Sequence, residues 1–115
     1  MTVYGIKNCN TVKNALDWLK KKNVGYDFHD YKTKGITREK LQRWTKQVGW
    51  ESLVNKRGTT WRKLDPAEQA RVKDEKSAID LMMEKTSVIK RPLIEKDGEV
   101  VALGFDEDSY KELVQ

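Results

Sequence analysis

The chain of 115 residues contains a single cysteine and a single histidine. One cysteine cannot form an internal disulfide, so the fold should not depend on oxidation, and a reducing cytosol is the compartment we expect. One cysteine and one histidine without clustered carboxylates make no usual metal-ligand set, and we expect no metal ion. The sequence also lacks a phosphate-binding glycine loop and a hydrolase triad. Few side chains remain that can carry chemistry.

Long apolar runs are missing as well. The opening stretch, residues 1–6, is too short for the apolar core of a secretory signal, and Lys7, Asn8 and Asn10 interrupt it. Nowhere does an apolar run approach the roughly 20 residues that a membrane span needs. We therefore expect a cytoplasmic protein without a membrane partner. The length suits one domain, residues 1–115, with its own core, and there is no linker, repeat or low-complexity segment.

The net charge is modestly positive. Lys and Arg number 23 against 18 Asp and Glu, a formal charge of +5. Apart from residues 20–22, where cations suit the end of a predicted helix, the basic residues are spread along the chain. The even spread favours ordinary solubility over a nucleic-acid surface, so we expect no direct nucleic-acid binding.

Periodicity predicts how the chain begins. Residues 2–6 form a short apolar strand, and a helix beginning near Thr11 follows, because residues 12, 15, 16 and 19 are apolar at helical spacing. Residues 26–31 then alternate as a strand does. A right-handed crossover makes the two strands parallel.

The rest of the chain reads as short helices followed by a hairpin. We predict helices from Thr37 to Gly49, over residues 50–55, from Asp65, and from Ser77 to near Lys85. The methionines at 82 and 83 and the tryptophans at 18, 44, 50 and 61 are predicted to fill the core. Residues 93–96 and 99–103 flank Asp97-Gly98, a hairpin turn, and Asp106 can cap a last helix.

This order predicts an α/β protein with a thioredoxin-like fold. A four-stranded mixed sheet carries the N-terminal and C-terminal helices. A helical insertion, about residues 36–87, separates the βαβ half from the ββα half.

Cys9 is the strongest candidate for chemistry. It falls where the first strand turns into the first helix, and the unpaired amides and positive dipole end of a helix N-terminus favour the nucleophilic thiolate. The polar neighbours Lys7, Asn8 and Asn10 argue against a buried hydrophobic thiol. Position 12 is valine, so there is no C-x-x-C, and any disulfide in a reaction cycle must form with another molecule.

Four further residues could build an anion site near this thiol. Arg91 immediately precedes a strand that faces the helix N-terminus, and Lys7 lies two residues before Cys9. Lys56 and Arg57, in the loop of residues 55–60, are weaker candidates of the same kind.

Two other residues invite a structural interpretation. Pro92, taken on sequence alone, is predicted to limit an edge strand. His29 is predicted to be structural, since it lies on a strand with no partner evident from the sequence.

Four segments together suggest a family: residues 4–11 (YGIKNCNT), 26–31 (YDFHDY), 55–64 (NKRGTTWRKL) and 89–92 (IKRP). With them the chain resembles, nearly end to end, the arsenate reductase (ArsC)-related family, which includes YffB-type proteins and Spx transcription regulators. The segments are most similar to the YffB branch. The resemblance implies a thioredoxin-like domain with a helical insertion and a cis bond at Arg91-Pro92, beside the thiol.

The resemblance also implies a reaction. In glutaredoxin-coupled arsenate reductases a thiolate attacks arsenate held by three arginines, and glutathione and glutaredoxin resolve the adduct. Cys9 matches the nucleophile and Arg91 one arginine. The second arginine falls near Asn55, with Lys56 or Arg57 as imperfect substitutes, and the third near Phe105. The histidine that precedes the nucleophile is replaced near Gly5.

The leading hypothesis is therefore a glutathione-dependent thiol oxidoreductase without a tightly bound cofactor. Cys9 would attack a substrate or form a mixed disulfide with glutathione, the co-substrate, and glutaredoxin is a second expected partner. Arg91 and Lys7, with Lys56 or Arg57, would hold the anionic group. Two alternatives stay open: arsenate reduction proper, and an Spx-like regulator that binds RNA polymerase. For the regulator, Val12 removes the characteristic C-x-x-C redox switch.

Overall fold

A computed structural model describes residues 1–114 of the chain. The chain forms two compact units, one of residues 1–34 with 91–114 and the other of Gly35–Lys90. The predicted insertion, residues 36–87, falls inside the second unit. No helix within the described residues is both long enough and apolar enough to cross a membrane.

The first unit contains the predicted four-stranded mixed sheet. Its elements are β1 (Thr2–Gly5), α1 (Asn10–Lys21), β2 (Asp27–Asp30), α2 (Tyr31–Lys34), β3 (Leu93–Lys96), β4 (Glu99–Leu103), α8 (Glu107–Lys111) and η2 (Glu112–Val114). The strand order is β2-β1-β3-β4, with β1 and β2 parallel and the other pairs antiparallel. The thioredoxin-like fold is thereby confirmed. The second strand was predicted too long, because Tyr31 already begins α2.

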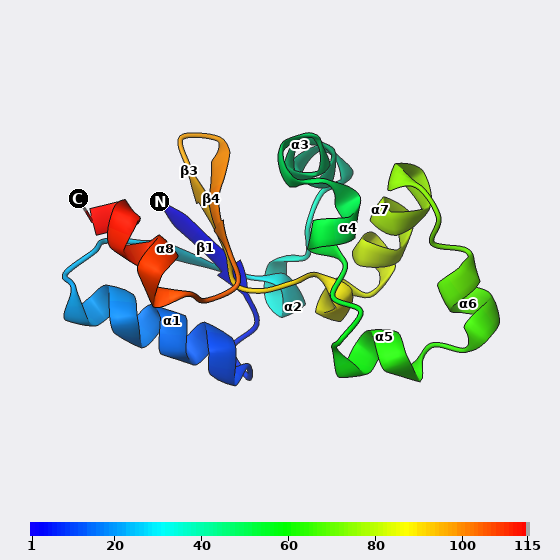
Figure 1. Cartoon of the computed structure of the whole chain (residues 1–115), viewed down its shortest axis with the longest axis horizontal. Helices are drawn as coiled ribbons and strands as arrows, with labels where there is room; N and C mark the ends of the chain where they lie inside the picture. The colour runs from blue at the N-terminus through cyan, green and yellow to red at the C-terminus, as the bar shows by residue number, and fades with distance from the viewer. Residues whose placement is uncertain (115) are drawn as a thin grey trace. The chain divides into compact units, whose positions relative to one another are not determined.

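Both α1 and α8 lie on the same side of this sheet (Figure 1). Successive strand residues point to opposite faces, so the register partners Val3 and Ile94 share the face that these helices cover. The two helices meet where Trp18 packs edge-on against Tyr110, with ring centroids 5.6 Å apart. This core fixes the start of α1 relative to the end of β1, which is where Cys9 lies.

The C-terminal hairpin forms as predicted. Asp97 and Gly98 both have positive φ, 54° and 80°, as a type I′ turn requires. The interpretation of Pro92 as edge-limiting is wrong, because β3 lies between β1 and β4. Pro92 is tolerated because it precedes the strand, and its carbonyl accepts a hydrogen bond from the Gly104 amide at 2.8 Å.

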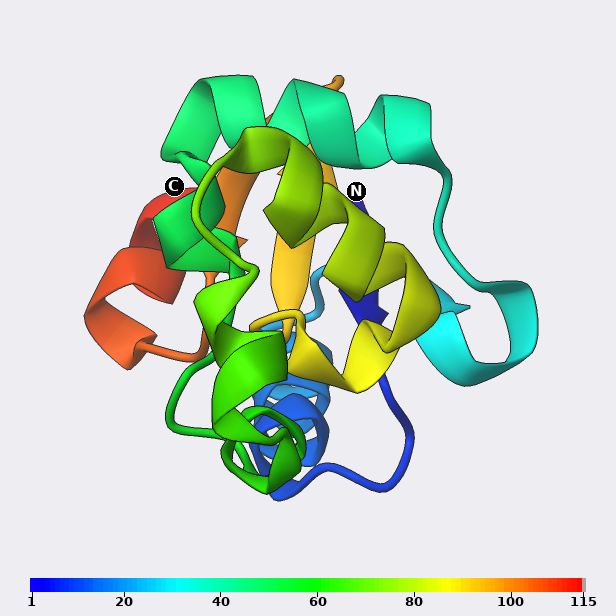
Figure 2. The ribbon, with the colours of Figure 1, turned by 90° about the vertical axis from the view of Figure 1, so that its right-hand side faces the viewer.

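The second unit is helical. Its elements are α3 (Arg38–Val48), α4 (Trp50–Leu53), α5 (Thr59–Lys63), α6 (Pro66–Ala70), α7 (Glu75–Glu84) and η1 (Thr86–Val88). Helices α3, α4 and α7 pack against one another, as Figure 2 shows for α3 and α7. The predicted caps form: Thr37 accepts from the Lys40 amide and Asp65 from the Glu68 amide.

Three details of the second unit differ from the prediction. Helix α7 begins two residues before Ser77, because Asp74 is the N-cap and Ser77 closes a capping box from the third helical position. Residues 59–60, predicted as loop, open α5. Met83 is 39% exposed and does not fill the core, whereas Met82 is buried.

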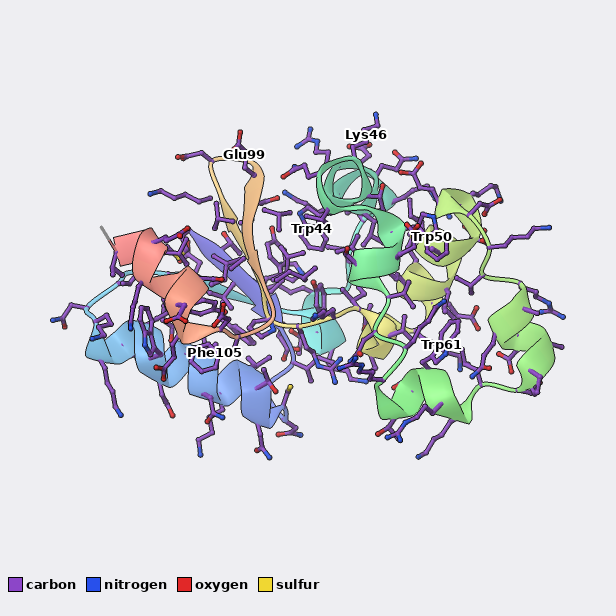
Figure 3. The ribbon with its side chains drawn as sticks, viewed as in Figure 1. Trp44, Lys46, Trp50, Trp61, Glu99 and Phe105 are labelled. Atoms are coloured by element: carbon purple, nitrogen blue, oxygen red, sulfur yellow. The ribbon has the colours of Figure 1, made fainter. Side chains whose placement is uncertain are left out.

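The tryptophans largely fill the core as predicted. Trp18, Trp44 and Trp61 are buried, and Trp50 is half-buried. Figure 3 labels the three that belong to the second unit, on α3, α4 and α5.

Candidate active site

Cys9 is the N-cap residue of α1. Its backbone is extended, and its carbonyl accepts the first helical hydrogen bond from the Lys13 amide at 2.9 Å. The thiol is not in a disulfide, is partly exposed and makes no capping hydrogen bond. The first turn of α1 carries no acidic residue, so its free amides and positive dipole end face this position without a competing carboxylate. The structure thus places the partly exposed thiol at the N-terminal end of α1.

Arg91 and Pro92 reach the same end of the sheet. The Arg91-Pro92 peptide is cis, as the family resemblance implied. In the antiparallel β1–β3 ladder Tyr4 is opposite Leu93, and one further step puts Pro92 beside Gly5. From Gly5 the chain runs on through the exposed Lys7 to Cys9. The register therefore brings the Arg91-Pro92 backbone to the carboxyl end of β1, the end from which the chain leads through Lys7 to Cys9.

A buried polar cluster lies on the face of the sheet opposite to α1 and α8. The Tyr4 hydroxyl donates a hydrogen bond to Glu95 Oε1 at 3.2 Å. The Tyr4 ring lies 4.8 Å from that of His29 and 6.1 Å from that of Tyr31. His29 therefore has aromatic partners that were not evident from the sequence.

Tyr31 links this cluster to Arg91. Burial raises the pKa of the Tyr31 phenol, the negative charges of Tyr4 and Glu95 add to the rise, and the Arg91 guanidinium opposes it. Tyr31 is 1% exposed, and its hydroxyl has no hydrogen-bond partner among residues 1–114. The charge of Arg91 is therefore felt at the buried Tyr31 phenol.

Lys56 and Arg57 belong to the second unit, in the turn between α4 and α5. The Lys56 ammonium lies 5.4 Å from the centre of the Trp61 ring, a cation–π distance. The Arg57 amide donates to Asn55 Oδ1 at 3.2 Å, which holds the turn. Their share in an anion site stays a prediction.

The position of the third reductase arginine is apolar. Phe105 lies between β4 and α8 (Figure 3), and its ring is 5.0 Å from that of Tyr110. This ring packs against the core of the first unit and supplies no cation. Among residues 1–114, no three His, Cys, Asp or Glu side chains are grouped so that they could hold a metal ion.

Two features were missed from the sequence. The Tyr4–Glu95–Tyr31 cluster requires the β1–β3 register, although the polar Glu95 inside an apolar strand was a usable signal. A groove beside α1, between Lys7 and Lys20, depends on how β2 lies against the helix.

A thioredoxin-like sheet, a lone thiol at the N-cap of α1 and a cis proline at the adjoining strand define a class of single-cysteine thioredoxin-fold proteins. The model of the ArsC family matches residues 4–113. The chain belongs to the ArsC family, and the resemblance noted from its sequence is confirmed.

The relatives span more than one kind of protein. A solved structure of a YffB protein is 47% identical, with a TM-score of 0.92, covering 99% of this chain and 98% of that one. The solution structure of an arsenate reductase (ArsC) related protein from Brucella melitensis is 45% identical, with a TM-score of 0.78 over 96% of this chain and 91% of that one. The global transcriptional regulator Spx of Streptococcus pyogenes is 27% identical over 114 residues, 96% of this chain and 82% of its own.

Proposed function

We propose that this ArsC-family protein is a glutathione-dependent thiol oxidoreductase with Cys9 as its only nucleophile. The observation that carries the proposal is the partly exposed Cys9 thiol at the N-cap of α1, with no acid in the first turn and no second cysteine in the chain. Thiolate is the reactive form of cysteine, and a helix N-terminus favours it.

The cycle needs glutathione as its second thiol. The Cys9 thiolate attacks the glutathionyl sulfur of a mixed disulfide. A new S–S bond forms, the old one breaks, and the substrate leaves as a thiolate that takes up a proton. A glutathione thiolate then attacks the glutathionyl sulfur on Cys9. Glutathione disulfide is released and the Cys9 thiolate returns, so the substrate thiol is freed and one reduced glutathione is oxidised.

The charges near Cys9 suit this substrate. Glutathione carries two carboxylates, and Arg91 and Lys7 lie at the same end of the sheet as the thiol. A hydrogen bond to a charged group contributes about 1.5–3 kcal/mol. Arg91→Ala should therefore raise KM for a glutathionylated substrate by about tenfold or more, at ~1.4 kcal/mol per factor of ten.

The proposal is tested by mixing the reduced protein with glutathione disulfide and measuring its mass. We expect one glutathionyl group on Cys9, none on Cys9→Ser, and loss of the group when reduced glutathione is added. Turnover of a glutathionylated peptide is followed by coupling to glutathione reductase and NADPH. An unmodified Cys9 after prolonged incubation would rule the proposal out.

Arsenate reduction is the second candidate, favoured by the arsenate reductase-related protein among the relatives and by the match of Arg91. Two of the family's three arginine positions lack arginine here, near Asn55 and Phe105. At about 1.5–3 kcal/mol for each lost contact, arsenate should bind two to four orders of magnitude more weakly. Arsenate-dependent NADPH consumption, coupled through glutaredoxin and glutathione reductase, tests this, and both Cys9→Ser and Arg91→Ala should abolish it.

A regulator is the non-enzymatic alternative, favoured by the similarity to Spx over nearly the whole chain. It would lack the C-x-x-C switch, since position 12 is a buried valine. A pull-down with RNA polymerase distinguishes the regulator from the enzyme. Binding that survives Cys9→Ser would favour the regulator, and its absence would favour the enzyme.

A further inference from the structure

A groove of about 340 Å³ lies between α1 and β2. Its apolar lining comes from Val12 and Leu16 on α1 and from Phe28 on β2. Val12 is buried, while Leu16 and Phe28 are half-buried and pack on the core with one side. The groove therefore has an apolar floor held by the fold.

The walls of the groove are positively charged. Lys7, Lys13 and Lys20 line it together with one acid, Asp17, and all four side chains are exposed. The lining carries a net charge of +2, from three lysines less one aspartate. An occupant with carboxylates matches these walls, and one with an aliphatic or aromatic side chain matches the floor.

The groove is lined by residues that lie close to Cys9 along the chain. Lys7 precedes Cys9 by two residues, and the Lys13 amide donates to the Cys9 carbonyl at 2.9 Å. From Lys13 to Lys20 the helix rises about 10 Å, the length of about three extended residues. A chain bound along α1 can therefore present a sulfur to Cys9 at one end.

We propose that this groove binds an acidic segment of the polypeptide whose mixed disulfide Cys9 attacks. An apolar side chain of that segment rests on Leu16 and Phe28, and its carboxylates lie beside the lysines. The inference rests on the proposed function and adds the substrate class, a glutathionylated protein with an acidic flank. Glutathione alone is a poor occupant, because it has no bulky apolar side chain to cover the floor.

The test compares two peptides, each with one glutathionylated cysteine followed by Glu-Leu-Glu or by Lys-Leu-Lys. We expect the acidic peptide to have the lower KM. Lys20→Glu should raise that KM three- to tenfold, because it replaces an attraction by a repulsion. Lys21→Glu is the matched control: it makes the same charge change in the same last turn of α1 but lies outside the groove, and should shift KM less than twofold.

Two further measurements identify what binds in the groove. Replacing leucine by serine in the acidic peptide should raise KM several-fold. The rate at which glutathione disulfide glutathionylates reduced Cys9, followed by mass, should be the same in Lys20→Glu and the parent protein. If Lys20→Glu and Lys21→Glu changed the KM of the acidic peptide equally, the proposed role of the groove would be wrong. The groove proposal would also be overturned if Lys20→Glu slowed the glutathionylation of Cys9 by glutathione disulfide as much as it slowed turnover of the acidic peptide, because the groove would then hold glutathione.

A direct binding measurement tests the groove independently of the reaction at Cys9. A fluorescent acidic peptide without cysteine is titrated with the protein, and its anisotropy should rise with an affinity that Lys20→Glu lowers at least threefold. If the peptide binds as expected but Cys9 is not glutathionylated, the groove proposal is supported and the proposed function is wrong. If Cys9 turns over but this peptide does not bind, the groove is wrong and the proposed function stands.

Discussion

Val12, on the first turn of α1, lies directly against Gly5 at the end of β1. A Cβ added to Gly5 would be 2.9 Å from Val12 Cγ2 and 3.2 Å from Cγ1. The Val12 side chain is β-branched and 1% exposed, so it has little room to move away. This contact sets the distance between the strand end and the helix start, and the loop between them carries Cys9.

Gly5→Ala should therefore destabilise the protein, by about 1–3 kcal/mol as overpacked cores do. The free energy of unfolding from urea titration, followed by tryptophan fluorescence, measures the effect. Val12→Ala removes the clashing methyl groups, so the double variant should lose less stability than the two single changes added together. Strict additivity would contradict the contact.

Two buried tyrosines should make the fold sensitive to alkali. Burial raises the pKa of Tyr31 and Tyr110 above the ordinary value. Above a pH of about 10 the unfolded chain loses these protons while the folded protein keeps them, so stability falls as the pH rises. For Tyr31 the slope approaches ~1.4 kcal/mol per pH unit. Urea titrations at pH 7 and pH 11 should show a smaller alkaline loss in Tyr31→Phe.

At pH 7 the hydroxyl groups of Tyr31 and Tyr110 should contribute differently to the stability of the fold. The Tyr110 hydroxyl donates to the Gly104 carbonyl at 2.9 Å, so Tyr110→Phe should cost about 1 kcal/mol. The Tyr31 hydroxyl has no such partner within residues 1–114, and Tyr31→Phe should be neutral or slightly stabilising. A loss above about 1.5 kcal/mol in Tyr31→Phe would mean that its hydroxyl is satisfied.

Most of the fold was predictable because its signals are local. The apolar spacing of α1, the Asp97-Gly98 turn and the caps Thr37, Asp65 and Asp106 each specify one element by short-range chemistry. One error arose where two local signals compete. At the start of α7 both Asp74 and Ser77 can cap, and the capping box uses both, which moves the start upstream.

The site was only partly predictable because it depends on strand register. Cys9 needed only a strand followed by a helix. The nearness of Arg91-Pro92 needed the pairing of β1 with β3, which the predicted layout supplied, whereas the cis bond came from the family resemblance alone. Tyr31 could not be assigned to the cluster, because the sequence pattern placed it on the second strand, whereas it begins α2.

The capping box of α7 should weaken in acid. Hydrogen bonds from the Ser77 hydroxyl and then the Ser77 amide lower the pKa of Asp74 below its ordinary value. Such a group stabilises the fold above that ordinary value, near 3.9, and the contribution is lost as the pH falls through the folded value. Between pH 5 and pH 2 the Tm of Asp74→Asn should fall less than that of the parent protein. Superimposable Tm curves would show that this cap does not contribute.

The first turn of α1 offers a direct test of whether charge at the start of the helix controls the reactivity of Cys9. Thr11 is exposed, and α1 has no acid in this turn. Thr11→Glu should stabilise the helix through its dipole but disfavour a neighbouring anion, so alkylation of Cys9 by iodoacetamide at pH 7 should slow about two- to fivefold. Thr11→Gln, similar in size and uncharged, should leave the rate unchanged. If both variants slow alkylation equally, access to the thiol governs its reactivity, and the charge at the start of α1 does not.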